Sequence, residues 1–223
     1  MPRLLFLLTF GLVGTAILVW LGVWQLQRLE WKQGILAEID ARIDDEPVAL
    51  PADPDPETDT YLAVTAAGTI LPGELHVLVS QKNIGAGYRV IAPFVTETGR
   101  RIMIDRGFAR QTAKDAPRAL GPFEVTGNLH WPQERDRFTP DPETEDNIWF
   151  ARDVPAMARA LDTEPVLLVA RTQTDPGLDP MPIGTANIPN DHLQYAITWF
   201  SLALIWVAMT VFFIRRPRAR KTE

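Results

Sequence analysis

Cysteine is absent from the 223-residue sequence, which excludes disulfides, thiolate metal sites and covalent attachment of a c-type haem. Histidine is nearly as scarce: His76, His130 and His192 are widely separated, and none is spaced to share a metal with another on one helix face. No Gly-x-Ser-x-Gly elbow, phosphate loop or dinucleotide fingerprint occurs. Carboxylates are common in predicted loops but form no catalytic pair. We therefore expect no enzyme, and a membrane-anchored hydrolase is the least favoured hypothesis.

Positive charge is sparse between Gln27 and Gln194, where 27 acidic residues face 16 basic ones. Such a segment has no basic stripe to neutralise phosphates, so we expect no nucleic-acid partner. The positive charge is concentrated after the last apolar run, in Arg215, Arg216, Arg218, Arg220 and Lys221.

Two long apolar runs are present, Leu4–Trp24 and Tyr195–Ile214. Each is about twenty residues long, enough for a helix to cross the roughly 30 Å core of a bilayer. The first run is too long for the core of a cleavable signal peptide and lacks a small-residue cleavage site after it, which favours an uncleaved anchor. We therefore predict a membrane protein with lipid as one of its contacts.

The flanking charges predict the orientation. The tail 215–223 carries five Lys or Arg residues, whereas the flank 175–194 carries none, so the C-terminus is expected in the cytoplasm. Two spans then place the N-terminus there as well, and the acidic middle outside. No Arg- and Ser-rich leader precedes the first span, which favours a bacterial plasma (inner) membrane with a periplasmic central domain.

The middle of the chain changes to short apolar strands punctuated by turns. The predicted strands are Val64–Ile70, His76–Val79, Gly87–Val95, Arg101–Phe108, Phe123–Leu129 and Val166–Ala170. Thr98-Gly99 is predicted as a hairpin turn, and Val154–Leu161 as a short helix capped by Asp153 with Pro155 in its first turn. Near-regular strand spacing is typical of a compact antiparallel sandwich or barrel, so we expect a β-rich, α+β domain.

The predicted organisation has five segments. These are a transmembrane helix at 1–26 with a helical extension to about 43, a Pro- and acid-rich linker at 44–59, an extracytoplasmic β-rich domain at 60–189, a second transmembrane helix at 190–214, and a basic cytoplasmic tail at 215–223.

The second span begins with a possible ligand. Asn190 is a good candidate for the N-cap, which places His192 in the first helical turn. Helical spacing groups one imidazole with aromatic and small residues on one face, namely His192, Tyr195, Ala196, Trp199, Ala203 and Trp206. Two interpretations stay open: an aromatic interface anchor, or an axial ligand for a planar, apolar, iron-containing group such as haem.

The first span carries the small residues Gly11, Gly14, Thr15 and Gly22, which favour close packing against similar gaps at Ala196, Ala203 and Ala208. Large residues occupy another side of the same predicted helix, at Trp20, Trp24, Arg28 and Trp31.

Three blocks carry a family resemblance. "PNDHLQYAITWFSLA" and "LGVWQLQRLEWK" closely resemble the two membrane-helix signatures of the surfeit-locus family, and "GYRVIAPFV…GRRIMIDRGFAR" resembles its central strands. This chain has Asp191 where the family more often has Asn, and Asp105 and Phe108 where it has Asn and Trp. For Arg106-Gly107 the simplest expectation from the residues is a strand end with a glycine turn.

The resemblance implies an assembly factor for cytochrome c oxidase that binds haem a and assists its delivery to the catalytic subunit. It implies His192 as the axial ligand of the haem iron, with Tyr195, Trp199 and Trp24 around the haem and Arg28 paired with a propionate. Haem a synthase and a second copy of the chain stay open as further partners. The alternative is a membrane scaffold that stabilises an oxidase assembly intermediate without touching a cofactor.

Overall fold

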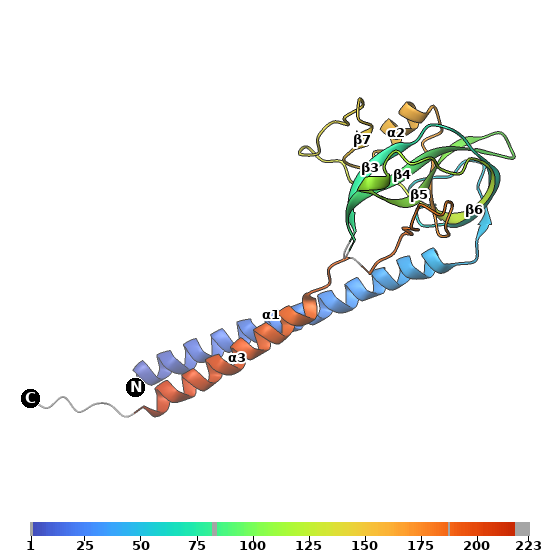
Figure 1. Ribbon diagram of the computed structural model, residues 1–223. Helices are drawn as coiled ribbons and strands as arrows, with labels where there is room; N and C mark the ends of the chain where they lie inside the picture. Colours follow the sequence, from blue (N-terminus) through green and yellow to red (C-terminus); the bar gives the residue numbers. More distant parts are fainter. Residues whose placement is uncertain (1, 82–83, 187, 217–223) are drawn as a thin grey trace, which may run out of the picture. The chain divides into compact units, whose positions relative to one another are not determined.

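The computed structural model describes residues 2–81, 84–186 and 188–216 (Figure 1). The chain forms two compact units, one from residues 1–38 with 186–223 and one from residues 39–185. The first is helical and the second is β-rich, so the predicted class of two terminal helices bracketing a β domain is confirmed. The part of the predicted basic tail beyond Arg216 lies outside the described residues.

The helical unit contains α3 (His192–Arg215) and most of α1 (Pro2–Asp44). Both helices are long and apolar enough to cross a membrane. No proline interrupts α1 after its first residue, and the helix ends three residues before Pro47, because the residue preceding a proline disfavours helical backbone. The predicted helical extension to about residue 43 is therefore confirmed.

The start of α3 differs from the prediction. Asp191, not Asn190, is the N-cap residue, and its side chain makes no capping hydrogen bond. The amide oxygen of Asn190 is buried and has no hydrogen-bond partner among the described residues. Asn190 does not cap α3 because the helix begins one residue later than predicted. Its side chain therefore cannot reach the unpaired backbone N–H groups of the first turn.

The described residues of the β-rich unit form eight strands. They are β1 (Val48–Ala49), β2 (Ala63–Ile70), β3 (Leu75–Gln81), β4 (Gly85–Thr96), β5 (Arg101–Arg110), β6 (Gly121–Leu129), β7 (Ile148–Trp149) and β8 (Leu167–Ala170). A 3-10 turn, η1 (Gln111–Ala113), follows β5, and α2 (Val154–Leu161) lies between β7 and β8. All six predicted strands are present, whereas β1 and β7 are too short to give a sequence pattern and were missed.

The strands form one sheet in the order β1-β2-β6-β8-β5-β4-β3-β7. An additional pairing between β2 and β4 closes the five strands β2, β6, β8, β5 and β4 into a barrel. The predicted barrel-like domain is confirmed, but the sheet is mixed, because β1–β2, β3–β7 and β5–β8 pair in parallel. Strand β8 can run parallel to β5 because α2 and its flanking loops precede it and allow a crossover.

Two apolar cores use opposite faces of the same strands. On β5, Ile102 and Ile104 point into the first core, whereas Met103 points into the second, which also holds α2. Leu168 and Leu167 alternate in the same way on β8. Burial on both faces explains why these strands read as continuous apolar runs rather than as alternating ones.

The local turn and cap predictions are confirmed. Asp153 accepts a hydrogen bond from the Ala156 N–H at 3.1 Å and caps α2, with Pro155 in the first turn. Gly99 adopts φ +83° between β4 and β5 and donates to the Thr96 carbonyl. Both features depend on local hydrogen bonds, which is why sequence alone identifies them.

The interpretation of Arg106-Gly107 as a strand end is wrong. Both residues lie inside β5, where they face the single residue Val90 of β4 and form a β-bulge. Gly107 has φ +103°, and a Cβ there would lie 2.3 Å from the carbonyl oxygen of Asp179. Arg106 is fully buried at this bulge, where its guanidinium donates to Thr174 and to the carbonyl of Ala119.

This geometry predicts a large stability loss for Gly107→Ala. The change combines left-handed backbone strain with a backbone clash, so we expect roughly 3 kcal/mol or more of destabilisation. The measurement is urea unfolding of the detergent-solubilised chain followed by tryptophan fluorescence.

Gly121→Ala is the matched control. Gly121 has nearly the same φ, +106°, but open space around the position of a Cβ. It should cost only the backbone strain, about 1–2 kcal/mol. Equal losses for the two variants would show that the Asp179 contact has no part in the effect.

Candidate functional site

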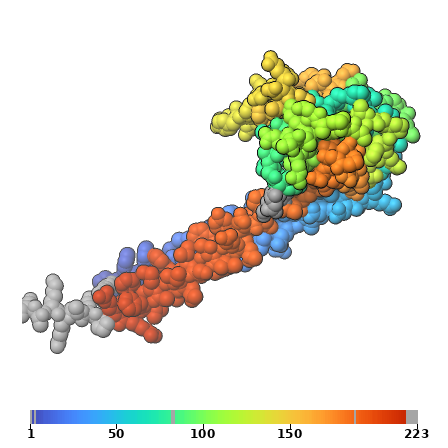
Figure 2. Space-filling view, viewed as in Figure 1, coloured from blue at the N-terminus to red at the C-terminus, as the bar shows by residue number. Residues whose placement is uncertain are grey.

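The two long helices pack against each other along a continuous seam (Figures 1 and 2). On α3 the buried or half-buried residues of this seam are His192, Ala196, Trp199, Ala203, Trp206 and Thr210. On α1 the central row of the seam is Gly11, Thr15, Leu18, Gly22, Gln25, Leu29, Lys32 and Leu36, and the half-buried Leu7, Gly14 and Leu21 flank this row. The α3 residues and this central row both alternate steps of three and four, the spacing of a coiled-coil seam, and contacts of Gly11 with Trp206 and of Gln25 with His192 make the pair antiparallel.

Large side chains of α3 fill the glycine gaps of α1. A Cβ on Gly14 would lie 2.4 Å from the Trp206 indole nitrogen, and one on Gly22 would lie 2.7 Å from the Phe200 ring. Trp206 Nε1 also donates to the Gly11 carbonyl at 3.1 Å. The predicted close packing of the helices is confirmed. Ala208, however, is exposed, and so is not one of the packing residues.

His192 lies at the end of this seam and contacts α1 directly. Its Nδ1 is 2.8 Å from the side-chain oxygen of Gln25. Lys32, two turns further along α1, donates to the carbonyl of Pro189, which lies just before α3. The first turn of α3 and the segment before it are thus fixed to α1 by two polar contacts.

The other predicted site residues occupy different positions. Trp199 is half-buried in the seam, whereas Tyr195 is 55% exposed and Trp24 is 44% exposed. Arg28 is exposed, and its guanidinium lies 4.3 Å from the centre of the Trp31 ring. Helical spacing groups Tyr195 on one face with His192 and Trp199, and in the structure Tyr195 is the exposed member of this group and lies outside the seam.

Tyr195 and Trp24 nevertheless lie on one side of the helix pair. Ile17 of α1 and Leu202 of α3 line a common apolar groove of about 430 Å³. Trp24 follows Ile17 by seven residues and Tyr195 precedes Leu202 by seven, and seven residues bring an α-helix back to nearly the same face about 10 Å along. Both aromatic residues therefore continue the side of the pair on which this groove opens.

Comparison with protein-family models matches residues 12–204 to the SURF1 family, which is most of the chain. The chain belongs to the SURF1 family. The match begins inside α1 and ends inside α3, so it contains the whole β-rich unit and the candidate haem-site residues Trp24, Arg28, His192, Tyr195 and Trp199. The resemblance found in the sequence blocks is thereby confirmed.

Individual relatives agree. A SURF1-like protein of Monosiga brevicollis is 35% identical over 88% of this chain and 83% of its own length. Surfeit locus protein 1 of Homo sapiens is 33% identical over 82% of this chain and 69% of its own length. Surfeit locus protein 1 of Takifugu rubripes is 31% identical over 88% of this chain and 92% of its own length.

The surroundings of His192 fit the haem iron that the family resemblance implies. Nδ1 is engaged by Gln25, and no described residue forms a hydrogen bond with Nε2. Nitrogen ligands of metals commonly have this arrangement, with the second ring nitrogen held by a hydrogen bond. The aromatic rings of Tyr195 and Trp24 supply apolar flat surfaces on one side of the pair.

Sequence reasoning missed Gln25 and Lys32 as partners of the first turn of α3. Gln25 is only 9% exposed although it is an amide in an otherwise apolar stretch of α1. The spacing of Gln25 could have identified it as a seam residue, because it follows Leu18 by seven residues and precedes Lys32 by seven. A polar residue at such a position requires a partner across the seam.

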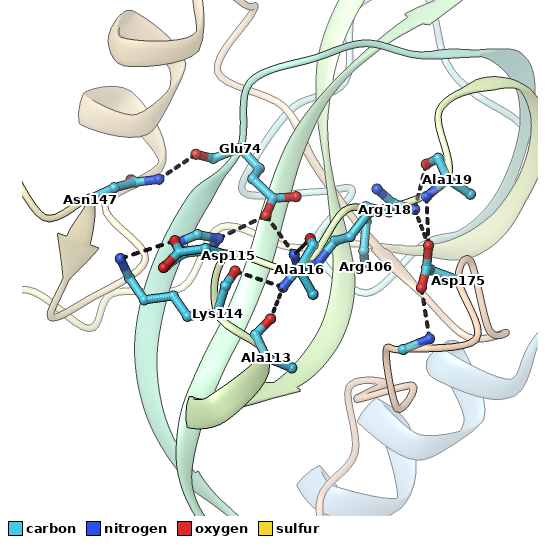
Figure 3. Close-up of polar contacts among 12 residues, drawn as sticks. Glu74, Arg106, Ala113, Lys114, Asp115, Ala116, Arg118, Ala119, Asn147 and Asp175 are labelled. Carbon is cyan, nitrogen blue, oxygen red and sulfur yellow. Dashed lines mark hydrogen bonds and ion pairs between the residues drawn. The ribbon is translucent and has the colours of Figure 1, made fainter.

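The β-rich unit holds a separate network of buried charge (Figure 3). Glu74 accepts from Arg118 at 3.1 Å and contacts His76 Nε2 at 2.8 Å. Arg118 also donates to the carbonyls of Ala113 and Ala116. His76 is a buried residue of this network.

Asp175 is the second acceptor of the network. It accepts from the N–H groups of Ala119 at 2.6 Å and Gly177 at 2.7 Å, and lies 3.8 Å from Arg106. Burial raises the pKa of Asp175, but these hydrogen bonds and the arginine charges outweigh it, so the pKa is below its usual value. Together Glu74 and Asp175 tie residues 111–121 to the sheet.

A further ionic group lies around Asp105, which is fully buried. Arg89 donates to Asp105 at 2.5 Å, and Arg152 lies 3.8 Å from it. Arg152 also forms an ion pair with Glu134 of the loop 131–153. Glu134 is itself exposed, and its carboxylate accepts hydrogen bonds from the backbone N–H and the guanidinium of the half-buried Arg152.

His130 lies close to this group. Burial lowers the pKa of His130 to about 4, and the charges of Arg152 and Arg89 act in the same direction while Glu134 opposes them. The His130 ring therefore binds a proton less readily in the native state than in the unfolded chain. The contribution of neutral His130 to the free energy of unfolding is fully present above pH 6.5 and is lost as the pH falls toward 4.

We predict a pH-dependent stability loss that His130→Gln reduces. Between pH 6.5 and 5 the protonation of His130 in the unfolded chain should cost at most about 2 kcal/mol, at 1.36 kcal/mol per pH unit. The slope of the urea midpoint against pH, measured on the solubilised chain, should be flatter in the variant over this range. Identical slopes would mean that His130 titrates normally.

Proposed function

We propose that this chain is an assembly factor for cytochrome c oxidase that binds haem a and assists its delivery to the catalytic subunit. The observation that carries the proposal is the arrangement at His192, where Gln25 holds Nδ1 and no described residue engages Nε2. Membership of the SURF1 family supports it, since the surfeit-locus resemblance implies oxidase assembly.

Each candidate residue would have a different role in haem binding. His192 would ligate the haem iron through Nε2, and the exposed rings of Tyr195 and Trp24 would pack against the macrocycle. Arg28 carries an exposed guanidinium that can bind a propionate carboxylate. Trp199 lies in the seam and would support His192 by packing. When bound, haem a would supply the iron, and His192 would ligate it.

A transfer function requires binding that can be reversed. The helix pair offers one strong ligand, and Tyr195 and Trp24 face outward rather than enclosing a cavity. Because these residues do not enclose a cavity, the helix pair would not have to unfold to release a bound cofactor. We propose non-enzymatic delivery for this reason, with the oxidase catalytic subunit as the recipient.

The two apolar helices support a location in a membrane. We propose the plasma membrane of a bacterium, with both termini cytoplasmic and the β-rich unit periplasmic, from the positive charge after α3. In this orientation His192 lies at the periplasmic end of α3.

His192→Ala tests the proposal. The parent chain, coexpressed with haem a synthesis and purified in detergent, should show a Soret band that pyridine haemochrome analysis assigns to haem a. We expect the variant to retain less than about a tenth of this haem, because the only proposed protein ligand of the iron is lost.

Gln194→Ala is the matched control, because Gln194 lies in the same turn but is exposed. It should keep the parental haem content. If His192→Ala binds as much haem as the parent, the ligand assignment is wrong. If the parent copurifies with an oxidase subunit but with no haem, the protein is a scaffold that acts through protein contacts alone.

A further inference from the structure

We infer that Gln25 is a positioning residue that holds His192 in the Nδ1–H tautomer and so leaves the Nε2 lone pair for a metal. The use of that lone pair rests on the proposed haem function, whereas the tautomer follows from the helix pair alone.

The donor and acceptor roles follow from the atoms in contact. The atom of Gln25 that lies 2.8 Å from His192 Nδ1 is the amide oxygen, which can only accept a hydrogen bond. Nδ1 must therefore carry the proton, and in a neutral imidazole the other nitrogen is then an acceptor. The histidine side chain in water favours the Nε2–H tautomer, so here the protein selects the form that can ligate through Nε2.

The placement of Gln25 supports a positioning role rather than chance. Its side chain is 9% exposed and lies between Gly22 and Leu29 in the seam, where an apolar residue would pack without the cost of burying an amide. Gly22 lets α3 approach closely, because the Phe200 ring occupies the space of a side chain there. The amide is therefore held at a fixed distance from the imidazole.

A second contact restricts rotation of the first turn of α3. Lys32 donates to the Pro189 carbonyl, three residues before His192. With the backbone held there and the ring held at Nδ1, the direction of Nε2 is defined before any metal binds. Such outer contacts commonly change metal affinity by about 10- to 100-fold.

The tautomer can be measured without haem. The full chain, labelled with ¹⁵N-histidine and held in detergent micelles at pH 8, should give an Nδ1–H pattern for His192 in long-range ¹⁵N–¹H spectra. The His192→Ala variant identifies this signal among the three histidines. Gln25→Met, which keeps the size but removes the acceptor, should shift His192 toward Nε2–H, and Gln25→Glu should restore Nδ1–H.

Haem binding supplies the second readout. Gln25→Met should weaken haem affinity about tenfold and lower the iron–histidine stretching frequency in resonance Raman spectra, and Gln25→Glu should reverse both effects. Gln27→Met, on an exposed position of the same helix, should match the parent.

The outcomes separate this inference from the proposed function. If the parent binds haem through His192 but Gln25→Met leaves the tautomer and the stretching frequency unchanged, the role of Gln25 is wrong and the function stands. If the parent shows Nδ1–H but binds no haem, the haem function fails and the tautomer assignment stands. A parental Nε2–H tautomer overturns the inference directly.

Discussion

Close contact between α1 and α3 is the constraint on which the candidate site depends. Helices in lipid gain little from burying apolar surface against each other, so their association relies on packing and on hydrogen bonds across the seam. Gly14 and Gly22 create gaps that Trp206 and Phe200 fill, and Gln25 and Lys32 add polar contacts at the end near His192. Without the glycine gaps the helices would lie further apart and Gln25 could not reach the imidazole.

The β-rich unit depends on a different balance, in which buried charges are paired inside a closed barrel. Asp105 is fully buried beside Arg89 and close to Arg152, and Arg106 is fully buried beside the carbonyl of Ala119. Such pairs add little net stability, but loss of one partner leaves a buried charge that typically costs about 3–5 kcal/mol. Their effect here is to fix the loops that carry Ala119, Arg152 and Met181 against the sheet.

Much of the fold could be predicted from local patterns. The two apolar helices, the six longer strands and the capped helix Val154–Leu161 follow from hydrophobic period, turn residues and a side-chain cap, all of which act over a few residues. The two-residue strands β1 and β7 could not be predicted, because their pairing depends on distant partners in β2 and β3. The buried bulge at Arg106-Gly107 was missed for the same reason, since it exists only in register with β4.

The sequence by itself determined the class of the protein, its family, and His192 as the residue to examine, because these follow from composition, spacing and recognisable blocks. Only the tertiary structure decided what surrounds His192. It brought Gln25 to the imidazole from 167 residues away, placed Trp199 in the seam and turned Tyr195 outward. The physical reason is that helical period fixes which residues share a face, whereas the rotation and separation of two helices are set by how their side chains interlock.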